Sequence, residues 1–341
     1  MRAAVKQQGK LTLPWLIALI ILPIVIGFVA MGIGRIWISP PEIFSSMIVK
    51  LTGGEAVSAQ NDMVLWNIRL PRVLLAALVG AGLSGAGCAY QSLFANPLAT
   101  PDTLGVASGA SFGAALGILL GMGLIGIQGS ALLFGGVAVL LTWLAGAGKG
   151  RGLNTIVLSG IMIGSLFSAL VSLVKYTADT ESQLPAITYW LMGSLDSANF
   201  GSLKLGAPPI LIGLIVLLAL RWRLNLLPLS EDEARSSGVN IRVLRGTVIV
   251  CATMMTASCV SMCGQVGWVG LLVPHICRMK FGNNHLSLMP ASISLGAVFM
   301  IMVDTLARSV SAAEIPVSIL TAIIGAPFFI ILMRRSGGWS L

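Results

Sequence analysis

Charged residues are scarce in this sequence. Only 10% of its 341 residues are Asp, Glu, Lys or Arg, whereas 56% are apolar. A soluble domain of this size needs more polar residues to cover its surface, so the composition excludes one. Regular alternation of polar and apolar residues is also lacking, which argues against a membrane β-barrel. These proportions predict an all-α integral membrane protein.

Residues for catalysis or metal binding are few as well. The five Cys lie in or beside apolar runs without metal-ligand spacing, so they are expected to be packing residues. His275 and His285, the two histidines, are expected to form structural hydrogen bonds. The segment Gly148-Lys149-Gly150 lacks the upstream glycine and the Ser or Thr of a Walker A loop. The sequence therefore predicts no catalytic residue, no metal site and no cofactor in this chain.

Apolar runs are what the sequence has in abundance. One membrane-spanning helix needs roughly 20 apolar residues, so the chain can hold about ten. The run at 267–280 is short, and both a crossing and a re-entrant segment remain open for it. The runs fall at 13–34, 70–93, 104–125, 130–148, 154–174, 203–222, 246–263, 267–280, 290–308 and 317–333.

The distribution of charge predicts the orientation. If both termini are cytoplasmic, fourteen of the 21 Lys and Arg residues fall on the cytoplasmic side, as the positive-inside rule expects. Eight of the twelve acids then fall outside or near the outer ends of spans. The net charge of +9 has this explanation, so nucleic acid is not expected as a partner. The length of the first run favours a retained span over a cleaved signal peptide.

Glycines repeat at helical spacing in two of the runs. Gly109, Gly113, Gly117 and Gly121 recur every four residues, and Gly160 with its neighbour at 164 repeats the spacing. Such stripes let helices approach closely, which predicts a dense bundle. Between spans, 35–68 is expected to be an outer loop with at most one short helix. Segment 179–199 is expected to be an outer loop with a short helix near 184–194.

Buried acids that could couple transport to an ion gradient are scarce. Asp304 is the only acid deep within a predicted span, and Arg308 follows four residues later. This pair is expected to satisfy itself. If the chain moves a solute uphill, a partner must therefore supply the energy.

One polar island at 228–246 interrupts the apolar runs. Six of its nineteen residues are charged. It is predicted to form two short helices, the first capped by Ser230 and stopped at Gly238, the second capped by Asn240. A solvated connection and a docking surface for a cytoplasmic partner are both open from this chemistry.

Several motifs together resemble one family. The ordered series resembles the FecCD-type permeases of ABC importers for iron(III)-siderophores, haem and vitamin B12, from about residue 15 to 335. It includes Arg69-Leu-Pro-Arg72, Asn96-Pro-Leu-Ala99-x-Pro101, Leu104-Gly-Val-x-Ser108-Gly109, Tyr189-Trp-Leu-Met-Gly193, Gly264-Gln-Val-Gly-Trp-Val-Gly-Leu-Leu-Val-Pro274-His275-x-x-Arg278, Asp304-x-x-Ala-Arg308, Glu314-Ile-Pro316 and Gly325-Ala-Pro327-Phe328.

The resemblance implies a fold, partners and a location. It implies one permease domain over 1–341 with ten spans, which pairs with a second copy or a paralogue in the lipid of the bacterial cytoplasmic membrane. Two cytoplasmic ATPase subunits bind ATP and Mg, and an extracytoplasmic binding protein delivers substrate. The island would carry the coupling helices. The coupling residues would be Glu231, Asp232, Glu233, Ala234, Arg235 and Gly238.

The resemblance also implies roles for other residues. Arg69, Arg72 and Arg308 match outer-side arginines that pair with acids of the binding protein, although headgroup anchoring is the alternative for the first two. Asn96 and Leu98 match a cytoplasmic gate, with its other half near Leu153 and Asn154, where this sequence lacks the expected small hydroxyl residues. An iron-siderophore complex is the first expected substrate, before haem or cobalamin. Rival functions are a self-sufficient secondary carrier or channel, and a scaffold or receptor.

Overall fold

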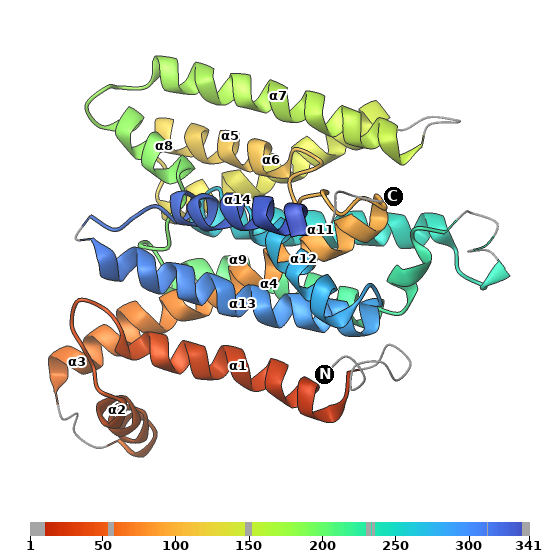
Figure 1. Ribbon diagram of the computed structural model, residues 1–341. Helices are drawn as coiled ribbons and strands as arrows, with labels where there is room; N and C mark the ends of the chain where they lie inside the picture. Colours follow the sequence, from red (N-terminus) through yellow and green to blue (C-terminus); the bar gives the residue numbers. More distant parts are fainter. Residues whose placement is uncertain are drawn as a thin grey trace.

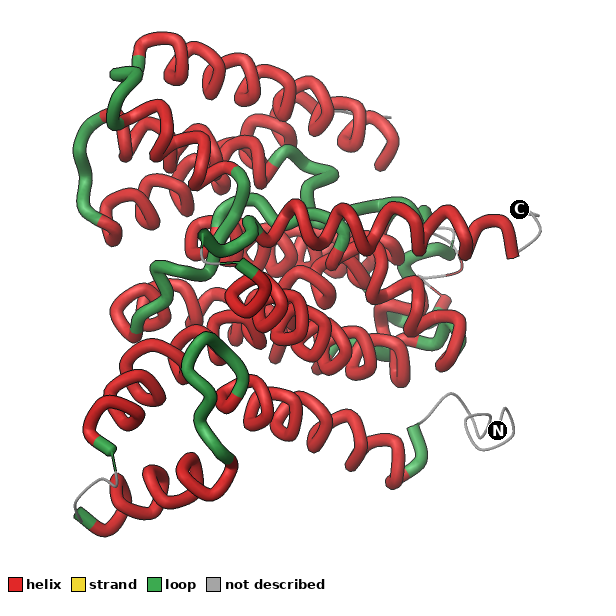
Figure 2. Tube along the Cα trace, turned by 60° about the vertical axis from the view of Figure 1, so that its left-hand side comes forward, coloured by secondary structure: helices red, strands yellow, loops and turns green. Residues whose placement is uncertain are grey.

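Helices make up the regular structure of this chain. The computed structural model describes residues 11–53, 58–146, 152–229, 233, 236–311 and 313–335, with side chains as far as Ile331. Every regular element among these residues is helical, which confirms the predicted fold class (Figure 2). The ten apolar runs correspond to α1 (Leu13–Gly32), α4 (Leu70–Leu93), α5 (Val106–Leu119), α6 (Leu124–Gly146), α7 (Leu153–Thr177), α9 (Phe200–Ala219), α11 (Ile241–Cys263), α12 (Val269–Phe281), α13 (His285–Val310) and α14 (Val317–Arg335).

Among the described residues, seven helices are long and apolar enough to cross a bilayer. They are α1, the helical stretch Ala59–Leu93 that contains α4, and then α6, α7, α9, α11 and α13. The remaining three, α5, α12 and α14, are shorter or less apolar. The α12 helix has only 13 residues, as its short apolar run suggested. Ten complete crossings therefore stay a prediction.

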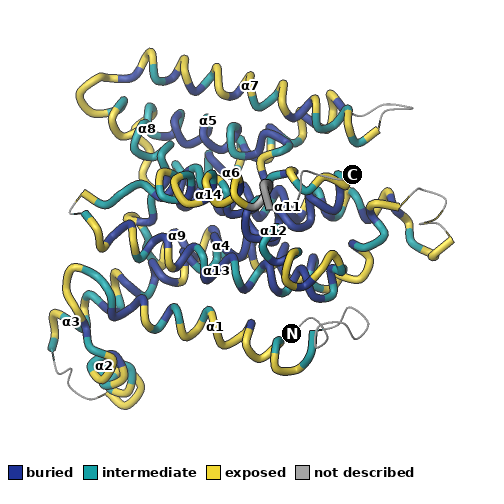
Figure 3. Tube along the Cα trace, in the orientation of Figure 1, coloured by how far each residue is buried: buried dark blue, intermediate teal, exposed yellow. Residues whose placement is uncertain are grey.

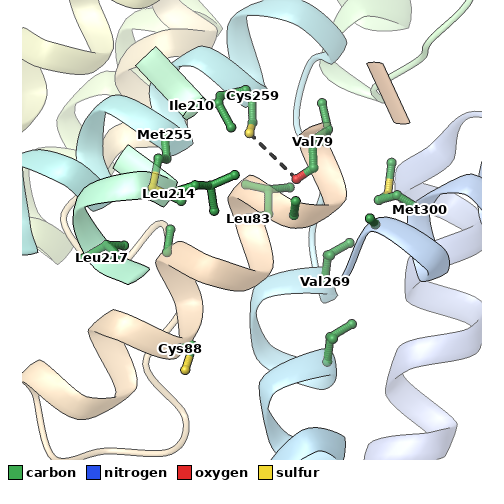
Figure 4. Packing of buried hydrophobic residues seen from close by; sticks show 14 of the residues in the cluster. Val79, Leu83, Cys88, Ile210, Leu214, Leu217, Met255, Cys259, Val269 and Met300 are labelled. Atoms are coloured by element: carbon green, nitrogen blue, oxygen red, sulfur yellow. Dashed lines mark hydrogen bonds between the residues drawn. The ribbon is translucent and has the colours of Figure 1, made fainter. Parts of the chain in front are cut away.

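The centre of the bundle is formed by α4 packed against α13. A Cβ atom added to Gly80 would lie 2.1 Å from the carbonyl oxygen of Gly296, so these two backbones approach as closely as glycine permits. Around α4 the core is closed by α9, α11 and α12 (Figure 4). Figure 3 shows α4 as largely buried, whereas α7 and α1 at the two edges are mostly exposed. The exposed edges indicate surfaces that meet lipid or another chain.

The two chain ends lie at the same end of the bundle, called here the terminal end (Figure 1). The opposite end carries the short elements α2 (Pro40–Thr52), α3 (Ala59–Met63), η2 (Val64–Arg69) and α8 (Gln183–Leu191). The short helix near 184–194 is thus confirmed as α8. Segment 35–68 was underestimated, because it holds two α-helices and the π-helical η2. The signal for α2 was local: Ser39 and Glu42 form a capping box, with prolines in the first turn.

The island is organised differently from the prediction. Gly238 has a φ of 72°, the left-handed conformation expected of a helix stop. Asn240 also acts as a cap, since its Oδ1 accepts hydrogen bonds from the N–H groups of Arg242 at 3.1 Å and Val243 at 3.3 Å. However, it caps α11 itself, which continues to Cys263, so the predicted second short helix and the span start at 246 are wrong. The first turns of α11 are polar enough to end a hydropathy run without ending the helix. The first island helix lies mostly outside the described residues.

The glycine stripe on α5 packs against α6. Added Cβ atoms at Gly109 and Gly113 would lie 2.5 Å and 2.3 Å from main-chain oxygens of α6, and one at Gly117 would lie 3.1 Å from Ile127. These contacts confirm the packing prediction for three of the four glycines. Gly121 differs, because it has a φ of 66° in the turn after α5 and nothing within 4 Å of an added Cβ.

Candidate functional site

A recess of about 620 Å³ lies between the segment 94–105, called here the α4–α5 loop, and the first half of α7. Both walls belong to the part of the bundle nearer the terminal end, because α4 ends there and α7 begins there. Most of the lining residues are small or hydroxyl-bearing. They are Phe94, Asn96, Leu98, Ala99, Thr100, Asp102, Thr103, Gly105, Ser108, Val157, Gly160, Ile161, Gly164, Ser165 and Ser168.

The α4–α5 loop holds its shape through its own polar side chains. The Asn96 Oδ1 accepts a hydrogen bond from the Leu98 N–H at 2.9 Å. The Thr103 Oγ1 accepts from the Thr100 N–H at 2.9 Å and donates to the Thr100 carbonyl at 2.6 Å. These turns leave the Leu98 side chain 48% exposed. The structure therefore brings two of the predicted gate residues, Asn96 and Leu98, to the wall of the recess.

Asp102 is the one carboxylate in the lining of this recess. Its Oδ1 accepts a hydrogen bond from the Ala107 N–H, at the start of α5, at 2.7 Å. Although the side chain is open to the recess, the surrounding protein displaces water, and this desolvation raises the pKa of Asp102 to about 6. The hydrogen bond from Ala107 opposes the increase.

The other wall is set by a close contact with α7. A Cβ added to Gly160 would lie 2.4 Å from the Thr103 carbonyl oxygen, so the loop rests directly on the helix backbone. Beyond this contact Ser165 and Ser168 line the recess, and each donates its hydroxyl proton to a carbonyl one turn earlier, at 2.9 Å. This back-bonding satisfies the hydroxyl donors and leaves their lone pairs for a solute or water.

The predicted second half of the gate is not in this lining. Leu153 packs against the core and Asn154 is exposed at the start of α7. Val157 and Ile161, about one and two turns further along α7, line the recess instead. A signal for this wall was present in the sequence: serines at 165, 168 and 172 form a polar stripe at helical spacing on an otherwise apolar run.

Buried charges are concentrated at the opposite end of the bundle. The Arg72 guanidinium contacts two acids, Asp304 and Glu314. Its Nη2 lies 2.9 Å from an oxygen of each carboxylate. Arg308 is more distant, with its Nε 3.6 Å from Asp304 Oδ2. The expectation that Asp304 and Arg308 satisfy one another is therefore only partly right, because Arg72 is the closer partner.

Arg308 and a neighbouring arginine, Arg69, hold the C-terminal end of α1 in place. Arg69 donates from Nη1 to the carbonyl oxygens of Met31 at 2.6 Å and Gly32 at 3.1 Å, and Arg308 donates to the carbonyl of Ala30. Cations are favourable at a helix C-terminus, where the last carbonyls lack partners within the helix. Arg69, Arg72 and Arg308 are only 4%, 6% and 7% exposed. In this structure they act inside the chain, and their role in docking stays a prediction.

The described part of the charged island lies at the terminal end (Figure 1). Glu231, Asp232, Ala234 and Arg235 lie outside the described residues. Glu233 and Gly238 are exposed, and the Glu233 carbonyl accepts a hydrogen bond from the Ser236 hydroxyl at 2.7 Å. Their exposure leaves them accessible to another protein.

A second recess, of about 670 Å³, joins this region to the α4–α5 loop. Its lining includes Ala95 and Pro97 from the loop and Pro228 from the start of the island. Between them, Arg278 of α12 donates to Gln91 of α4 at 2.8 Å. Residues of the island and of the α4–α5 loop therefore line one recess.

Comparisons with known proteins agree over most of the chain. The model described as the FecCD transport family matches residues 20–335. MolB, the permease protein of a molybdate import system in Haemophilus influenzae, is 44% identical over 321 residues, which cover 94% of this chain and 95% of that protein. A Helicobacter pylori protein named "Probable iron chelatin transport system permease protein" is 35% identical over 318 residues, 87% of this chain and 96% of its own. Among solved structures, a metal-chelate type ABC transporter in an inward-facing conformation superposes with a TM-score of 0.85 at 41% identity, covering 94% and 99% of the two chains.

Proposed function

Because the chain belongs to the FecCD transport family, we propose that it forms one wall of a solute pathway that two permease subunits enclose. The chain is a multi-pass permease subunit of an ABC importer and not an enzyme, since the relatives that match over most of its length are permeases of that kind. The recess between the α4–α5 loop and α7 carries the proposal, because these two walls leave it open toward the outside of the chain and α7 lies at the edge of the bundle.

The exposed surface of α7 supports the proposal that a second subunit forms the other wall of the pathway. Leu158, Met162 and Leu166 are each more than half exposed, and Ser165 and Ser168 lie within three residues of Leu166 along the helix. Apolar side chains alone would suit lipid, whereas glycine and serine at helical spacing are typical of helices that meet another helix or a polar pathway. A second copy or a paralogue would complete the recess.

The terminal end is proposed to be cytoplasmic and to receive two ATPase subunits. The charged island lies there, and ATP with Mg would bind to those subunits and leave this chain without a cofactor. ATP binding and a loaded binding protein would favour different states of the permease, which is the condition for net transport by alternating access. The second recess, lined by Pro228 of the island and by Ala95 and Pro97 of the α4–α5 loop, supports the proposal that motion of the island reaches this loop.

The substrate is proposed to be a metal-containing solute. The sequence resemblance favoured an iron-siderophore complex, with haem or cobalamin behind it, whereas a relative at 44% identity is named for molybdate. The hydroxyl groups of Thr100, Thr103 and Ser168 could form hydrogen bonds with a metal chelate or a metal oxyanion, whereas the Asp102 carboxylate beside them disfavours an anion while it is ionised. A competition binding assay with the cognate binding protein, using molybdate, ferric siderophores, haem and cobalamin, decides between these substrates.

Uptake into proteoliposomes tests the proposed function. Vesicles that hold the permease with its ATPase and binding protein should accumulate the solute only with ATP and an intact Walker A lysine in the ATPase. Accumulation by the permease alone would instead support a self-sufficient carrier or channel. If the complete system binds its partners and accumulates none of the four solutes, the scaffold or receptor hypothesis gains.

A further inference from the structure

Helix α2 has an unusual position. It lies at the end of the bundle opposite the chain ends and is seen almost end-on in Figure 1, whereas α1 runs across the picture, so α2 lies crosswise to α1. Figure 2 confirms that it stands outside the packed bundle. Short helices in such positions usually belong to a solvated loop, and their open face is then polar.

The polar side of α2 is turned toward the protein. The Ser46 hydroxyl donates to a carboxylate oxygen of Asp62 and accepts a hydrogen bond from the Trp66 Nε1 at 2.8 Å. Glu42 closes the capping box by accepting a hydrogen bond from the Ser39 N–H at 2.9 Å. The polar groups of this helix therefore have partners in their own cap, in α3 and in η2.

The open side of α2 is apolar. Phe44, Ile48 and Leu51 are 57%, 59% and 88% exposed. At about 100° per residue they fall within roughly 60° of one another, on the side of the helix away from Glu42 and Ser46. A helix with polar groups inside and a compact apolar stripe outside is the reverse of a helix in water, and it indicates an apolar medium at the open face.

The neighbouring surface identifies that medium. The Phe44 ring lies 4.8 Å from the ring of Phe28 on α1, which places the α2 stripe next to α1. Ile24 and Val29 of α1 are 65% and 48% exposed, and α1 is the most hydropathic of the spanning helices. The apolar surface of a membrane-spanning helix thus continues onto α2.

Residues typical of the membrane interface flank this stripe. Trp37 is 66% exposed just before α2. The Lys50 Nζ lies 5.7 Å from the Trp66 ring centre, near the end of the helix. Tryptophan and lysine are enriched at the level of the lipid headgroups. We propose that α2 is an in-plane anchor, lying in the headgroup region of the leaflet opposite the terminal end with Phe44, Ile48 and Leu51 toward the acyl chains.

The proposed anchor would fix how deep Arg69, Arg72 and Arg308 lie in the membrane. The polar side of α2 is bonded to Asp62 and Trp66, and η2 then leads within three residues to Arg69, which holds the end of α1. The proposal needs only that the chain spans a membrane, so it stands independently of the substrate and of the ATPase.

Depth measurements on the intact complex test the proposal. The permease with its ATPase is placed in nanodiscs after single substitutions Ile48→Cys, Leu51→Cys or Lys50→Cys, and each thiol is spin-labelled. The five native cysteines are free but buried, so labelling is directed to the introduced thiol. Lys50 is an exposed neighbour roughly 120° around the helix from Phe44, which makes it the matched control.

Labels at 48 and 51 should be accessible to oxygen and shielded from a water-soluble nickel complex, with a ratio several-fold above that at 50. Brominated lipids should quench a fluorophore at 48 and 51 in the same order. Equal ratios at all three positions would overturn the proposal. Shielding that appears only when the binding protein is added, or spin–spin broadening between copies, would assign this face to a protein partner instead.

Discussion

At the scale of single residues, the buried charges are the costliest feature of the chain. Arg72, Asp304 and Arg308 are each at most 7% exposed, so water screens them poorly. Two arginines share one fully buried carboxylate, and Glu314 supplies a second negative charge from a loop. Arg72 is 232 residues from Asp304, and no local pattern connects them. The spacing of four residues to Arg308 was visible in the sequence, whereas the stronger pair depends on the fold.

Removing one partner from this cluster should destabilise the protein strongly. Arg72→Gln leaves Asp304 with only the more distant Arg308, and breaking a buried ion pair typically costs about 3–5 kcal/mol. Glu314→Gln should cost less, because that side chain is 25% exposed. The midpoint of thermal unfolding in detergent measures both effects, with Lys204→Gln on the exposed surface of α9 as the control. Equal midpoints for Arg72→Gln and the control would show that the pair contributes no stability.

Gly160 is a second residue of interest, because the α4–α5 loop approaches its backbone closely. An added Cβ would lie 2.4 Å from the Thr103 carbonyl, so Gly160→Ala must move the α4–α5 loop or α7. We expect solute uptake to fall by tenfold or more while the protein still inserts. Gly136→Ala on α6 is the matched control, because an added Cβ there meets nothing within 4 Å. If both variants transport at the normal rate, the contact between loop and helix is not part of the pathway.

At the scale of elements, the helices were predictable and their ends were not. Long apolar runs identify helices because backbone groups in lipid must bond within their own segment. The start of α11 was misplaced because Arg242 and Arg245 end the apolar run while Asn240 caps the helix before them. The helix α2 was missed as an element of its own, since its Phe44, Ile48 and Leu51 stripe is too short for a hydropathy window. Its capping box at Ser39 was the available signal.

The charged island is the element expected to receive the ATPase. Replacing Glu231, Asp232 and Arg235 together should uncouple ATP hydrolysis from uptake while the protein still inserts in the membrane. Co-purification with the ATPase should fall several-fold, because complementary charges at an interface favour association. Lys175→Gln, at the opposite end of α7, should leave co-purification unchanged. Normal ATPase binding and normal uptake in the triple variant would remove the island from the docking surface.

At the scale of the whole molecule, the arrangement is asymmetric in a way that suits an importer. Buried charges stabilise the end away from the chain termini, while recesses lie nearer the terminal end. Composition predicted the membrane bundle, whereas the sidedness inferred from the charge distribution stays a prediction. The wall of the recess could not be predicted in full, because it pairs the α4–α5 loop with residues of α7 that are far away in sequence. Only packing places Asn96 and Leu98 opposite Val157 and Ile161.

The central claim is that this recess is a pathway wall whose accessibility changes with nucleotide. It is tested most directly by thiol labelling of Ser168→Cys in proteoliposomes that contain the permease, its ATPase and its binding protein. Leu166→Cys, an exposed α7 position that does not line the recess, is the control.

We predict that a membrane-impermeant maleimide labels Ser168→Cys from the terminal-end side, and that trapping ATP on the ATPase changes this rate at least tenfold. The rate at Leu166→Cys should not change. Identical labelling of Ser168→Cys with and without trapped ATP, on either side of the membrane, would contradict the account.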